Sequence, residues 1–435
     1  MSATGSTKVK VGLLGCGNVG GALVELVAEQ REEIAGRTGV ELEITRIAVH
    51  STAKDRGLDV PAAVFTTDAA AVVADPEVDI VVETIGGIEP ARELVLTAIA
   101  AGKPVITANK ELLANHGAEL YDAAAEAGVD LLYEAAVAGA IPLMRPLRES
   151  LIGEPVRRVM GIVNGTTNYI LSQMAEHGVS YQDALAEAQS LGYAERDPTA
   201  DVEGYDAGAK AAIIASIAFG ARVVAGDVYH EGISGITSAD IDFAKRLGYV
   251  IKLLAVTERV GDEDGAPVVA VRVHPAMVPG THPLASVRDS FNAVFVEGGA
   301  SGELMFYGRG AGGRPTASAV LGDLIDAATN KLDDTAASIG TLVRPRIQPI
   351  DELRSAYYLN LEVHDEPGVL ATVAGIFGQH KVSIRSMEQE GLGDDARLIF
   401  ITHPAVERDV RATLQELRSL DSVRQVGSML RVIGA

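Results

Sequence analysis

The fold of this chain is decided near its N-terminus by the stretch VGLLGCGNVG at residues 11–20. Its first half ends an apolar run that predicts a strand, and apolar residues then recur at helical spacing over residues 19–34. Between them, Gly15 permits a tight turn, Gly17 lets a pyrophosphate approach the backbone, and Gly20 lets helix and strand pack closely. The pattern predicts a dinucleotide at the helix N-terminus, where free N–H groups face an anion. A glycine cluster that serves helix packing alone is the alternative.

The segments that follow alternate between short apolar runs and longer helical patterns up to about residue 140. The predicted strands and helices lie at residues 42–49, 78–83, 104–107 and 129–134, and at residues 90–101 and 111–127, respectively. Such alternation implies right-handed crossovers and a parallel, doubly wound sheet. Residues 1–140 are therefore expected to form a Rossmann-type NAD(P)-binding domain.

The rest of the chain divides into three further segments. Residues 141–330 mix strands and helices without regular alternation, which predicts an α+β domain for catalysis and dimerisation. Residues 331–353 have weak periodicity and two prolines, Pro345 and Pro349, and we interpret them as a linker. Residues 354–435 follow the order βαββαβ, which predicts a ferredoxin-like unit.

Composition excludes several classes of partner. The chain carries 37 Lys and Arg against 59 Asp and Glu, a net charge of −22, so it has no electrostatic attraction for nucleic acid or an anionic membrane. No apolar run is long enough to span a bilayer, and the N-terminus has no apolar signal-peptide core. A single cysteine, Cys16, fits a reducing compartment, so a cytoplasmic protein is expected.

The end of the second predicted strand bears on the choice of cofactor. An NAD site usually has Asp or Glu there for the ribose 2′-hydroxyl, but residues 49–51 read Val-His-Ser. Lys54 and Arg56 follow, which favours the 2′-phosphate of NADP, although NAD is not excluded. The alternative is that both cations are ordinary solvated charges of a loop.

The densest cluster of polar residues is GYAERDPTADVEGYDAGAK at residues 192–210. Asp206 and Lys210 stand four residues apart, on one face of a predicted helix. The apolar residues 211–219 indicate that this helix is buried, and a buried lysine needs a partner to keep its proton. A lysine held in this way can protonate an oxygen that gains charge during hydride transfer. A surface ion pair is the alternative.

Two further stretches follow predicted strands of the first sheet, where ligands bind in such folds. TANK at residues 107–110 ends in Lys110, which we place near nicotinamide or substrate; a surface lysine at a helix start is the alternative. EAAVAGAIP at residues 134–142 combines one carboxylate with many backbone carbonyls, a set that suits a hard cation. The alternative for this second stretch is a tight crossing between domains.

Taken together, these motifs identify a family. With NGTTNYIL at residues 164–171, the chain resembles the bacterial homoserine dehydrogenases of the monofunctional long form over essentially its whole length. The resemblance implies NADPH-dependent, reversible reduction of L-aspartate 4-semialdehyde to L-homoserine, in threonine, methionine and isoleucine biosynthesis. Other two-domain NADP dehydrogenases, such as sugar enzymes with Glu-Lys-Pro near residue 110, and a non-catalytic amino-acid sensor are the rival interpretations.

The resemblance also implies roles for individual residues. Lys210 matches a proton-donating lysine with Asp206 beside it, Glu195 matches a glutamate that binds the substrate ammonium, and Asp201 lies in the same pocket, with Lys110 near both substrate and cofactor. The implied contacts to the dinucleotide come from Gly15, Gly17, Asn18, Val19, Gly20, Lys54, Arg56, Thr84, Lys110 and Gly310. A monovalent cation, usually sodium, is implied at Glu134 and the carbonyls of Val137, Gly139 and Ile141.

The C-terminal unit resembles ACT domains, which bind amino acids. DEPGVL at residues 365–370 is typical of their first strand-to-helix turn. The implied effector is threonine, acting as a feedback inhibitor, and edge-to-edge pairing of such units implies at least a homodimer, with a homotetramer possible. A unit that serves oligomerisation alone is the alternative.

Overall fold

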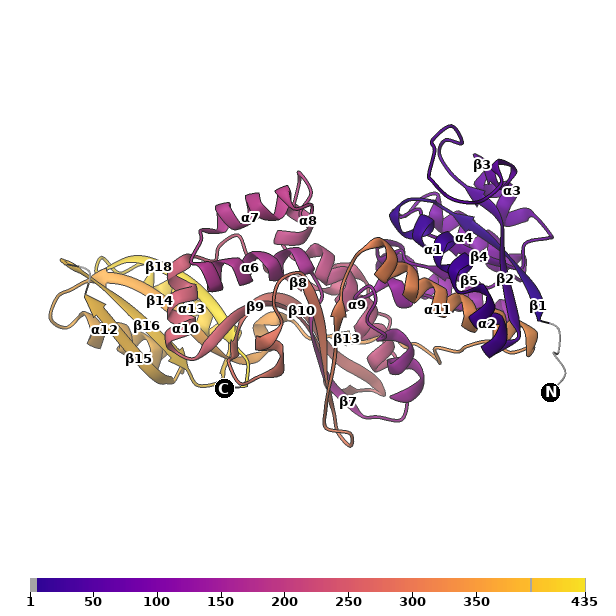
Figure 1. The fold of residues 1–435 in the computed structure, drawn as a ribbon. Helices are drawn as coiled ribbons and strands as arrows, with labels where there is room; N and C mark the ends of the chain where they lie inside the picture. The colour runs from indigo at the N-terminus through magenta and orange to yellow at the C-terminus, as the bar shows by residue number, and fades with distance from the viewer. Residues whose placement is uncertain (1–5, 392, 435) are drawn as a thin grey trace.

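The first sheet is parallel throughout, as the alternation of strands and helices predicts. The computed structural model describes residues 6–391 and 393–434. Its strand order is β3-β2-β1-β4-β5-β6, and every neighbouring pair is parallel (Figure 1). The strands are β1 (Thr7–Leu14), β2 (Val40–Ala48), β3 (Phe65–Thr66), β4 (Ile80–Glu83), β5 (Val105–Thr107) and β6 (Leu131–Leu132). The short β3 has no counterpart among the strands predicted from sequence.

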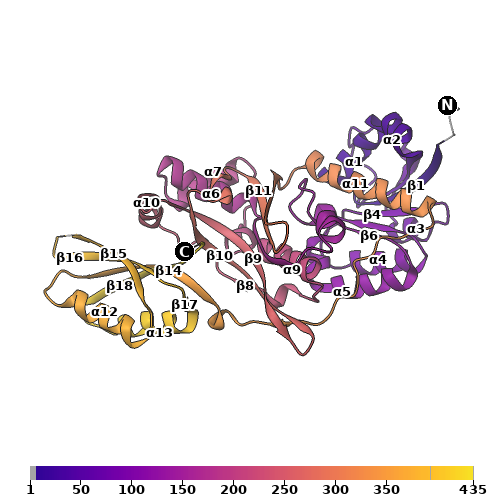
Figure 2. The same ribbon diagram turned by 90° about the horizontal axis from the view of Figure 1, so that it is seen from below.

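Helices cover this sheet, and one of them comes from a distant part of the chain. The local helices are α1 (Asn18–Glu29), α2 (Arg31–Thr38), α3 (Ala69–Ala74), α4 (Ala91–Ala100) and α5 (Lys110–Ala127). The helix α11 (Gly313–Leu332) packs against α1, with Ala317, Val320 and Leu324 in the same core as Leu23 (Figures 1 and 2). Sequence order assigns α11 to the second segment, but its apolar face is buried on the first sheet. The chain therefore crosses between the two units three times.

The second sheet is larger and runs through two of the predicted segments. Its order is β12-β11-β7-β9-β10-β18-β14-β16-β15. The strands of its first half are β7 (Val156–Ile162), β9 (Tyr249–Glu263), β10 (Ala266–Pro279), β11 (Phe291–Gly298) and β12 (Glu303–Arg309). The helices of this unit are α6 (Gly165–His177), α7 (Tyr181–Ser190), α8 (Thr199–Val202), α9 (Tyr205–Phe219) and α10 (Ser238–Arg246). Of these, α6, α9 and α10 contact β9, which places them over one face of the sheet.

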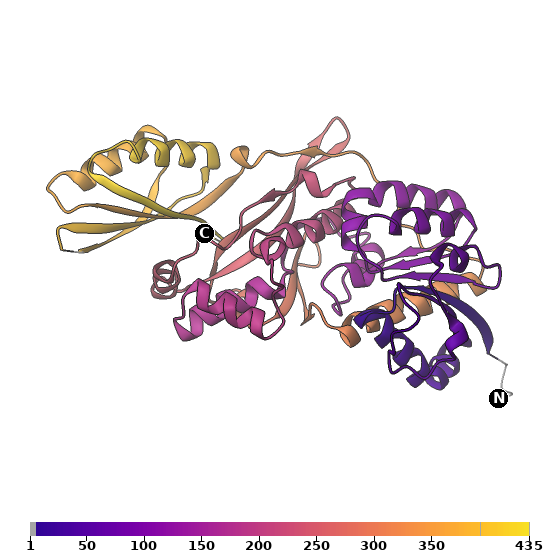
Figure 3. The same cartoon turned by 90° about the horizontal axis from the view of Figure 1, so that it is seen from above.

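The C-terminal unit has the predicted ferredoxin-like order, and its sheet is continuous with the preceding one. Its elements are β14 (Arg354–His364), α12 (Val369–Gln379), β15 (Ile384–Gly391), β16 (Asp395–Thr402), the short β17 (Ala405–Val406), α13 (Glu407–Leu417) and β18 (Val423–Val432). The helices α12 and α13 lie on one side of this sheet (Figure 3). The last strand, β18, pairs in parallel with β10 through Ala276 with Arg431 and Met277 with Val432. A single sheet therefore joins the two units that a linker separates along the chain.

The linker itself contains little regular structure. Between α11 and β14 lie the two-residue strand β13 (Arg346–Ile347) and one 3-10 turn, Ile350–Glu352. β13 pairs with β10, so the linker is fastened to the middle unit. Over the residues described, no helix is both long and apolar enough to cross a membrane.

Candidate active site

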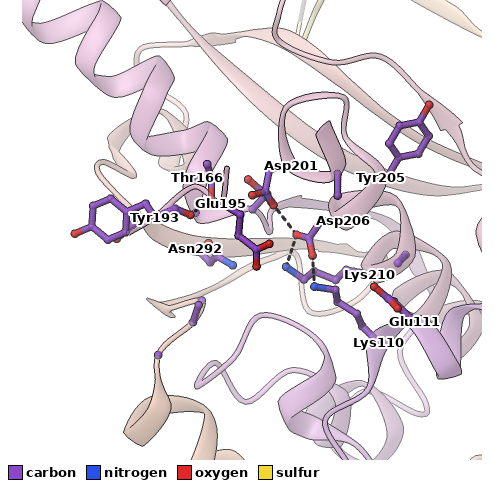
Figure 4. Close-up of a pocket in the computed structure, with 18 of the residues that line it drawn as sticks. Lys110, Glu111, Thr166, Tyr193, Glu195, Asp201, Tyr205, Asp206, Lys210 and Asn292 are labelled. Atoms are coloured by element: carbon purple, nitrogen blue, oxygen red, sulfur yellow. Dashed lines mark hydrogen bonds and ion pairs between the residues drawn. The ribbon is translucent and has the colours of Figure 1, made fainter. Parts of the chain in front are cut away.

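A cavity of about 930 Å³ lies between the first and second units. The first unit contributes the start of α5, and the second contributes α6, α8, α9 and the end of β12. Figure 4 shows the polar side chains that point into it. Lys110, Glu195, Asp201, Asp206, Lys210 and Gly310, all singled out in the sequence, line this cavity together. Residues separated by two hundred positions in the chain thus share one space.

The centre of the cavity is a single carboxylate that holds two ammonium groups. Lys210 Nζ lies 2.7 Å from Asp206 Oδ2, and Lys110 Nζ lies 2.5 Å from Asp206 Oδ1 (Figure 4). Both Lys110 and Asp206 belong to the first turn of their helices, where the dipole favours the carboxylate but not the lysine. The side chains of Asp206 and Lys210 are only 8% and 11% exposed, so the pair is not a surface ion pair.

Burial and charge compete in setting the proton affinity of this cluster. Burial alone would raise the pKa of Asp206, but Lys210 and Lys110 outweigh it and hold that pKa far below its usual value. Burial likewise works to lower the pKa of Lys110, and Asp206 outweighs it, so the net shift is upward. Asp206 is therefore ionised and Lys110 protonated at neutral pH.

An asparagine that the sequence analysis quoted only within a motif completes the cluster. Asn164 Nδ2 donates to Asp206 Oδ2 at 2.8 Å and to Asp201 Oδ1 at 2.7 Å. Its Oδ1 accepts the N–H of Thr167 at 2.9 Å, so Asn164 also caps α6. An asparagine directly before a helix is a recognisable signal for a cap, but sequence spacing gives no sign of the two carboxylates it bridges. Burial raises the pKa of Asp201, against the opposing effect of this hydrogen bond.

Glu195 occupies the wall of the cavity without a partner. It lies on the turn between α7 and α8 and is exposed to the cavity. Its carboxylate points toward the space in front of Lys210 (Figure 4). Within residues 6–391 and 393–434, no hydrogen bond or ion pair to this carboxylate is present. A cationic group of a ligand can therefore pair with it at no cost in internal contacts.

The glycine loop makes a tight turn and packs closely against its helix. Gly15 has φ +96°, and a Cβ on Gly20 would lie 2.3 Å from the carbonyl oxygen of Gly15. Thr84 Oγ1 donates to that carbonyl oxygen at 3.0 Å, so Thr84 fixes the loop from the next strand. Across the cleft, a Cβ on Gly313 would lie 2.8 Å from the backbone oxygen of Asn18. The starts of α1 and α11 therefore approach each other closely, next to Gly310.

Arg56 and Lys54 stand on the loop after β2. Arg56 donates to the carbonyl oxygens of Ser51 at 3.0 Å and Lys54 at 2.8 Å, and it lies over the ring of Phe65. Throughout the described part of the chain, neither cation has a carboxylate partner. Burial raises the pKa of the Cys16 thiol and Arg56 opposes that shift, which places the guanidinium within electrostatic reach of the glycine loop.

The loop at residues 137–141 presents backbone oxygens without donors. Ala138 and Gly139 both have φ +58°, and a Cβ on Gly139 would lie 2.3 Å from the oxygen of Gly310. In the described residues, nothing donates a hydrogen bond to the buried carbonyls of Val137, Gly139 and Ile141, whereas buried carbonyls normally have a donor. These oxygens fit a hard monovalent cation.

The side chain of Glu134, expected beside these carbonyls, has its own partners. Its carboxylate accepts the backbone N–H groups of Leu143, Met144 and Arg145, the last two at 2.7 and 2.9 Å. The carboxylate thus folds the chain back on itself and shapes the carbonyl loop. Among the described residues, no group of three or more His, Cys, Asp or Glu side chains has the arrangement of a metal site. The carbonyl loop is therefore different from a site for a transition metal.

The fold and the cavity together define a class of protein. A parallel sheet with a glycine loop, and a buried lysine aimed into a cavity beside it, are the parts of a nicotinamide-dependent dehydrogenase. Three family models match the chain and refine this class. The NAD binding domain of homoserine dehydrogenase matches residues 15–134, and the homoserine dehydrogenase model matches residues 142–325. The ACT domain model matches residues 357–422.

Individual relatives agree with the family models over the whole chain. The homoserine dehydrogenase of Corynebacterium glutamicum is 52% identical, covering 98% of this chain and 95% of the relative. That of Mycobacterium tuberculosis strain H37Rv is 50% identical, covering 98% of each. The crystal structure of a homoserine dehydrogenase from Thiobacillus denitrificans matches with a TM-score of 0.93 at 42% identity, covering 98% of this chain and 99% of the other. The chain belongs to the homoserine dehydrogenase family and is an NAD(P)-dependent oxidoreductase.

Proposed function

We propose that the protein reduces L-aspartate 4-semialdehyde reversibly to L-homoserine, with NADPH as the preferred reductant. The observation that supports this proposal is the Asp206 carboxylate with its two lysines, in a cavity that Gly310 also lines. Gly313, three residues further on, contacts the backbone of Asn18 in the glycine loop. A bound nicotinamide supplies the hydride. The residues of the chain then have to bind the substrate, orient it and provide a proton where the aldehyde oxygen gains charge.

Lys210 is the proposed proton donor. An ammonium group has three N–H donors, and two of those of Lys210 go to Asp206 and to the carbonyl oxygen of Val163, at 2.7 and 2.6 Å. The third is left for a substrate oxygen. When Lys210 gives up its proton, Asp206 is still paired with Lys110 and Asn164. The site therefore never leaves a buried carboxylate without a partner, which would be costly.

Substrate binding is proposed for the carboxylates around this centre. Glu195 faces the cavity without an internal partner and suits the α-ammonium group, while Asp201 contributes to the same negative wall. Lys110 is close enough to assist both substrate and cofactor. Fixing the substrate from its ammonium end holds the aldehyde carbon in one place, which by itself lowers the barrier.

The cofactor and cation proposals depend on the loops around the cavity. The glycines of the first loop, Asn18, Val19, Thr84 and Gly310 would hold the dinucleotide, and Lys54 with Arg56 would hold a 2′-phosphate. The carbonyls of Val137, Gly139 and Ile141 would hold sodium, in a loop that Glu134 shapes. Because this loop packs against Gly310, the cation would support the wall of the cavity rather than take part in the chemistry.

The remaining proposals concern regulation and assembly. We propose threonine as an inhibitor that binds the ACT domain, and a homodimer or homotetramer as the working form. In β15, the outer strand of the second sheet, nearly every side chain is exposed, which supports pairing with another chain. We also propose the division into residues 1–140, 141–330, 331–353 and 354–435, a cytoplasmic location, and a role in threonine, methionine and isoleucine biosynthesis.

One assay with several arms tests these proposals. The oxidation of NADPH is followed at saturating cofactor after addition of L-aspartate 4-semialdehyde, and we expect turnover at about 1–1,000 s⁻¹, the usual range for enzymes. NADH is expected to give a higher KM, threonine to inhibit, and replacement of sodium by choline at equal ionic strength to lower the melting temperature. Absence of NADPH oxidation with this aldehyde, by a folded protein, would disprove the proposed reaction.

A further inference from the structure

A three-residue segment lies between the ACT domain and the active site. The short strand β8 (Tyr229–His230) pairs in parallel with β10 at Arg272 and Val273, and the N–H of Glu231 extends the pairing to Val273 at 2.8 Å. Its neighbours are β10 on one side and α9 on the other (Figure 2). Since successive side chains of a strand point to opposite faces, Tyr229 and Glu231 face away from His230.

Tyr229 and Glu231 face the ACT domain and are held by its arginines. The Glu231 carboxylate accepts hydrogen bonds from both terminal nitrogens of Arg431, on β18, at 2.9 and 3.0 Å. Tyr229 donates to Glu231 at 2.7 Å and accepts a hydrogen bond from Arg411, on α13, at 2.6 Å. Arg431 is only 2% exposed and also binds Glu407, the first residue of α13. One buried ionic cluster thus connects β8 to both ACT elements.

His230 faces the opposite way, onto the catalytic helix. It lines the active-site cavity and packs against the ring of Tyr205, with ring centroids 5.1 Å apart. A Cβ on Gly208 would lie 2.0 Å from His230 Nε2, so the imidazole contacts the bare backbone of α9. Gly208 lies midway between Asp206 and Lys210, and any shift of the ring is therefore transmitted to the turn that carries both.

The residues just after β8 contact the helix that carries Asp201. The N–H of Ile233 donates to the carbonyl oxygen of Val202 at 2.8 Å. A Cβ on Gly232 would lie 2.4 Å from that same oxygen, so the two backbones touch here. β8 and its extension therefore contact α8 and α9, both of which line the cavity.

We propose that Glu231 and His230 are positioning residues that couple the ACT domain to the catalytic helix α9. The inference rests on the proposed function of Lys210 and adds the route by which an ACT ligand would act on it. Rearrangement of Arg431 and Arg411 releases or tightens β8, and β8 displaces His230 against α9. A displacement of about 1 Å at a catalytic group can cost on the order of 10²-fold in rate, so a small movement is sufficient.

The test uses the whole chain and compares two tyrosines, each of which forms a hydrogen bond between the ACT domain and the middle unit. Tyr229→Phe and Glu231→Gln weaken the cluster at β8, while Glu407 still compensates Arg431. Tyr358→Phe is the matched control, because its hydroxyl donates to Asp240 on α10 at 3.2 Å, and α10 does not border the cavity. Hydrogen–deuterium exchange is measured in peptides covering residues 199–219 and 238–246.

The two kinds of variant are expected to differ in where exchange increases. Glu231→Gln should speed exchange in residues 199–219 by about tenfold, the effect of losing a charge-assisted hydrogen bond on local opening, and Tyr229→Phe should do so less. Tyr358→Phe should affect residues 238–246 alone. With L-aspartate 4-semialdehyde, Glu231→Gln should lower kcat several-fold with an unchanged KM for NADPH, because the glycine loop is not touched.

The coupling is overturned if exchange in residues 199–219 stays at the wild-type rate in Glu231→Gln, or if Tyr358→Phe raises it equally. This readout requires no turnover. If the wild-type protein proves inactive on the semialdehyde, the proposed reaction fails while the exchange data still decide the coupling. His230→Ala is the second variant: it should increase exchange at residues 205–210 and leave the peptides of α13 and β18 unchanged, and an unchanged rate at residues 205–210 counts against the proposal.

Discussion

Two ionic clusters with opposite composition lie at the two boundaries of the middle unit, one facing the first unit and one facing the ACT domain. In the active site, one carboxylate, Asp206, binds two cationic side chains, Lys110 and Lys210. At the boundary with the ACT domain, one guanidinium, that of Arg431, binds two carboxylates, Glu231 and Glu407. Both clusters unite residues from two units of the fold.

The clusters differ in how completely their donors are used. All three nitrogens of the Arg431 guanidinium donate hydrogen bonds to Glu231 or Glu407. An arginine keeps its proton under all ordinary conditions. Lys210 retains one N–H directed at a cavity, and a lysine can lose a proton. A cluster whose cation keeps its proton suits the transmission of position, whereas one with a removable proton facing a cavity suits chemistry. Substitutions in each cluster test this difference.

The largest expected effect is that of Lys210→Ala on turnover. Loss of the donor should lower kcat by about 10³-fold, within the usual contribution of general acid catalysis. NADPH binding, measured by fluorescence titration, should stay within about twofold, because the glycine loop is unaffected. Lys210→Arg is the informative companion, since it keeps the charge without a removable proton, and it should be nearly as slow. Wild-type turnover in either variant would remove Lys210 from the mechanism.

Arg431→Met should chiefly affect stability. It removes the buried guanidinium that binds Glu231 and Glu407 and leaves Arg411 beside them, which should cost about 3 kcal/mol in the free energy of unfolding, the lower end for a broken buried pair. Arg259→Met is the control, because its partner Asp262 is exposed and such pairs contribute about 0–1 kcal/mol. Chemical denaturation measures both. A variant that combines Arg431→Met with Glu231→Gln and Glu407→Gln should recover much of the loss.

The loss of stability in Arg431→Met should depend on pH with a defined sign. Burial works to raise the pKa of Glu231, but Arg431 outweighs it and lowers that pKa in the folded protein. This lowered pKa contributes stability above the unfolded-state pKa of about 4.3, and the contribution disappears as pH falls. Without Arg431, Tyr229 and Arg411 oppose burial less strongly and the pKa of Glu231 rises, so the variant should regain stability relative to wild type on acidification from pH 7 to 5. A deficit independent of pH would contradict this account.

Asp206→Asn tests the other cluster through its pH profile. Asp206 now outweighs burial and keeps the pKa of Lys110 above its usual value; without it, burial acts unopposed by that carboxylate and the pKa falls. The alkaline limb of kcat/KM should therefore move to lower pH. Asp122→Asn is the control, since Asp122 pairs with Arg222 on the surface at 2.9 Å, and its limb should not move.

The two clusters also show what sequence can predict. The pairing of Asp206 with Lys210 follows from their spacing on one helix, and the apolar residues after them predict burial. The Rossmann sheet and the βαββαβ unit follow equally from local periodicity, and the structure confirms both. Each of these features depends on residues near one another in the chain.

Features that depend on distant contacts were not predictable. The chain gives no sign that α11 returns to the first sheet, or that β18 extends the sheet of β10, because both depend on faces that many apolar segments could cover. The Arg431 cluster joins residues about two hundred positions apart, and neither Glu231 nor His230 belongs to a motif. Asn164 was quoted only within a motif, and its bridge between two aspartates depends on the fold.

Arg56 sharpens the comparison because, in the described part of the chain, it pairs with no carboxylate. Over the residues described, its guanidinium is held by carbonyl oxygens, which orient it without neutralising it. Such a charge is available for a 2′-phosphate, and Arg56→Ala should raise the KM for NADPH by about tenfold, equivalent to about 1.4 kcal/mol. The KM for NADH should stay within about twofold, and this cofactor is the internal control for collapse of the loop. An equal rise for both cofactors would mean that Arg56 supports the loop rather than selects the phosphate.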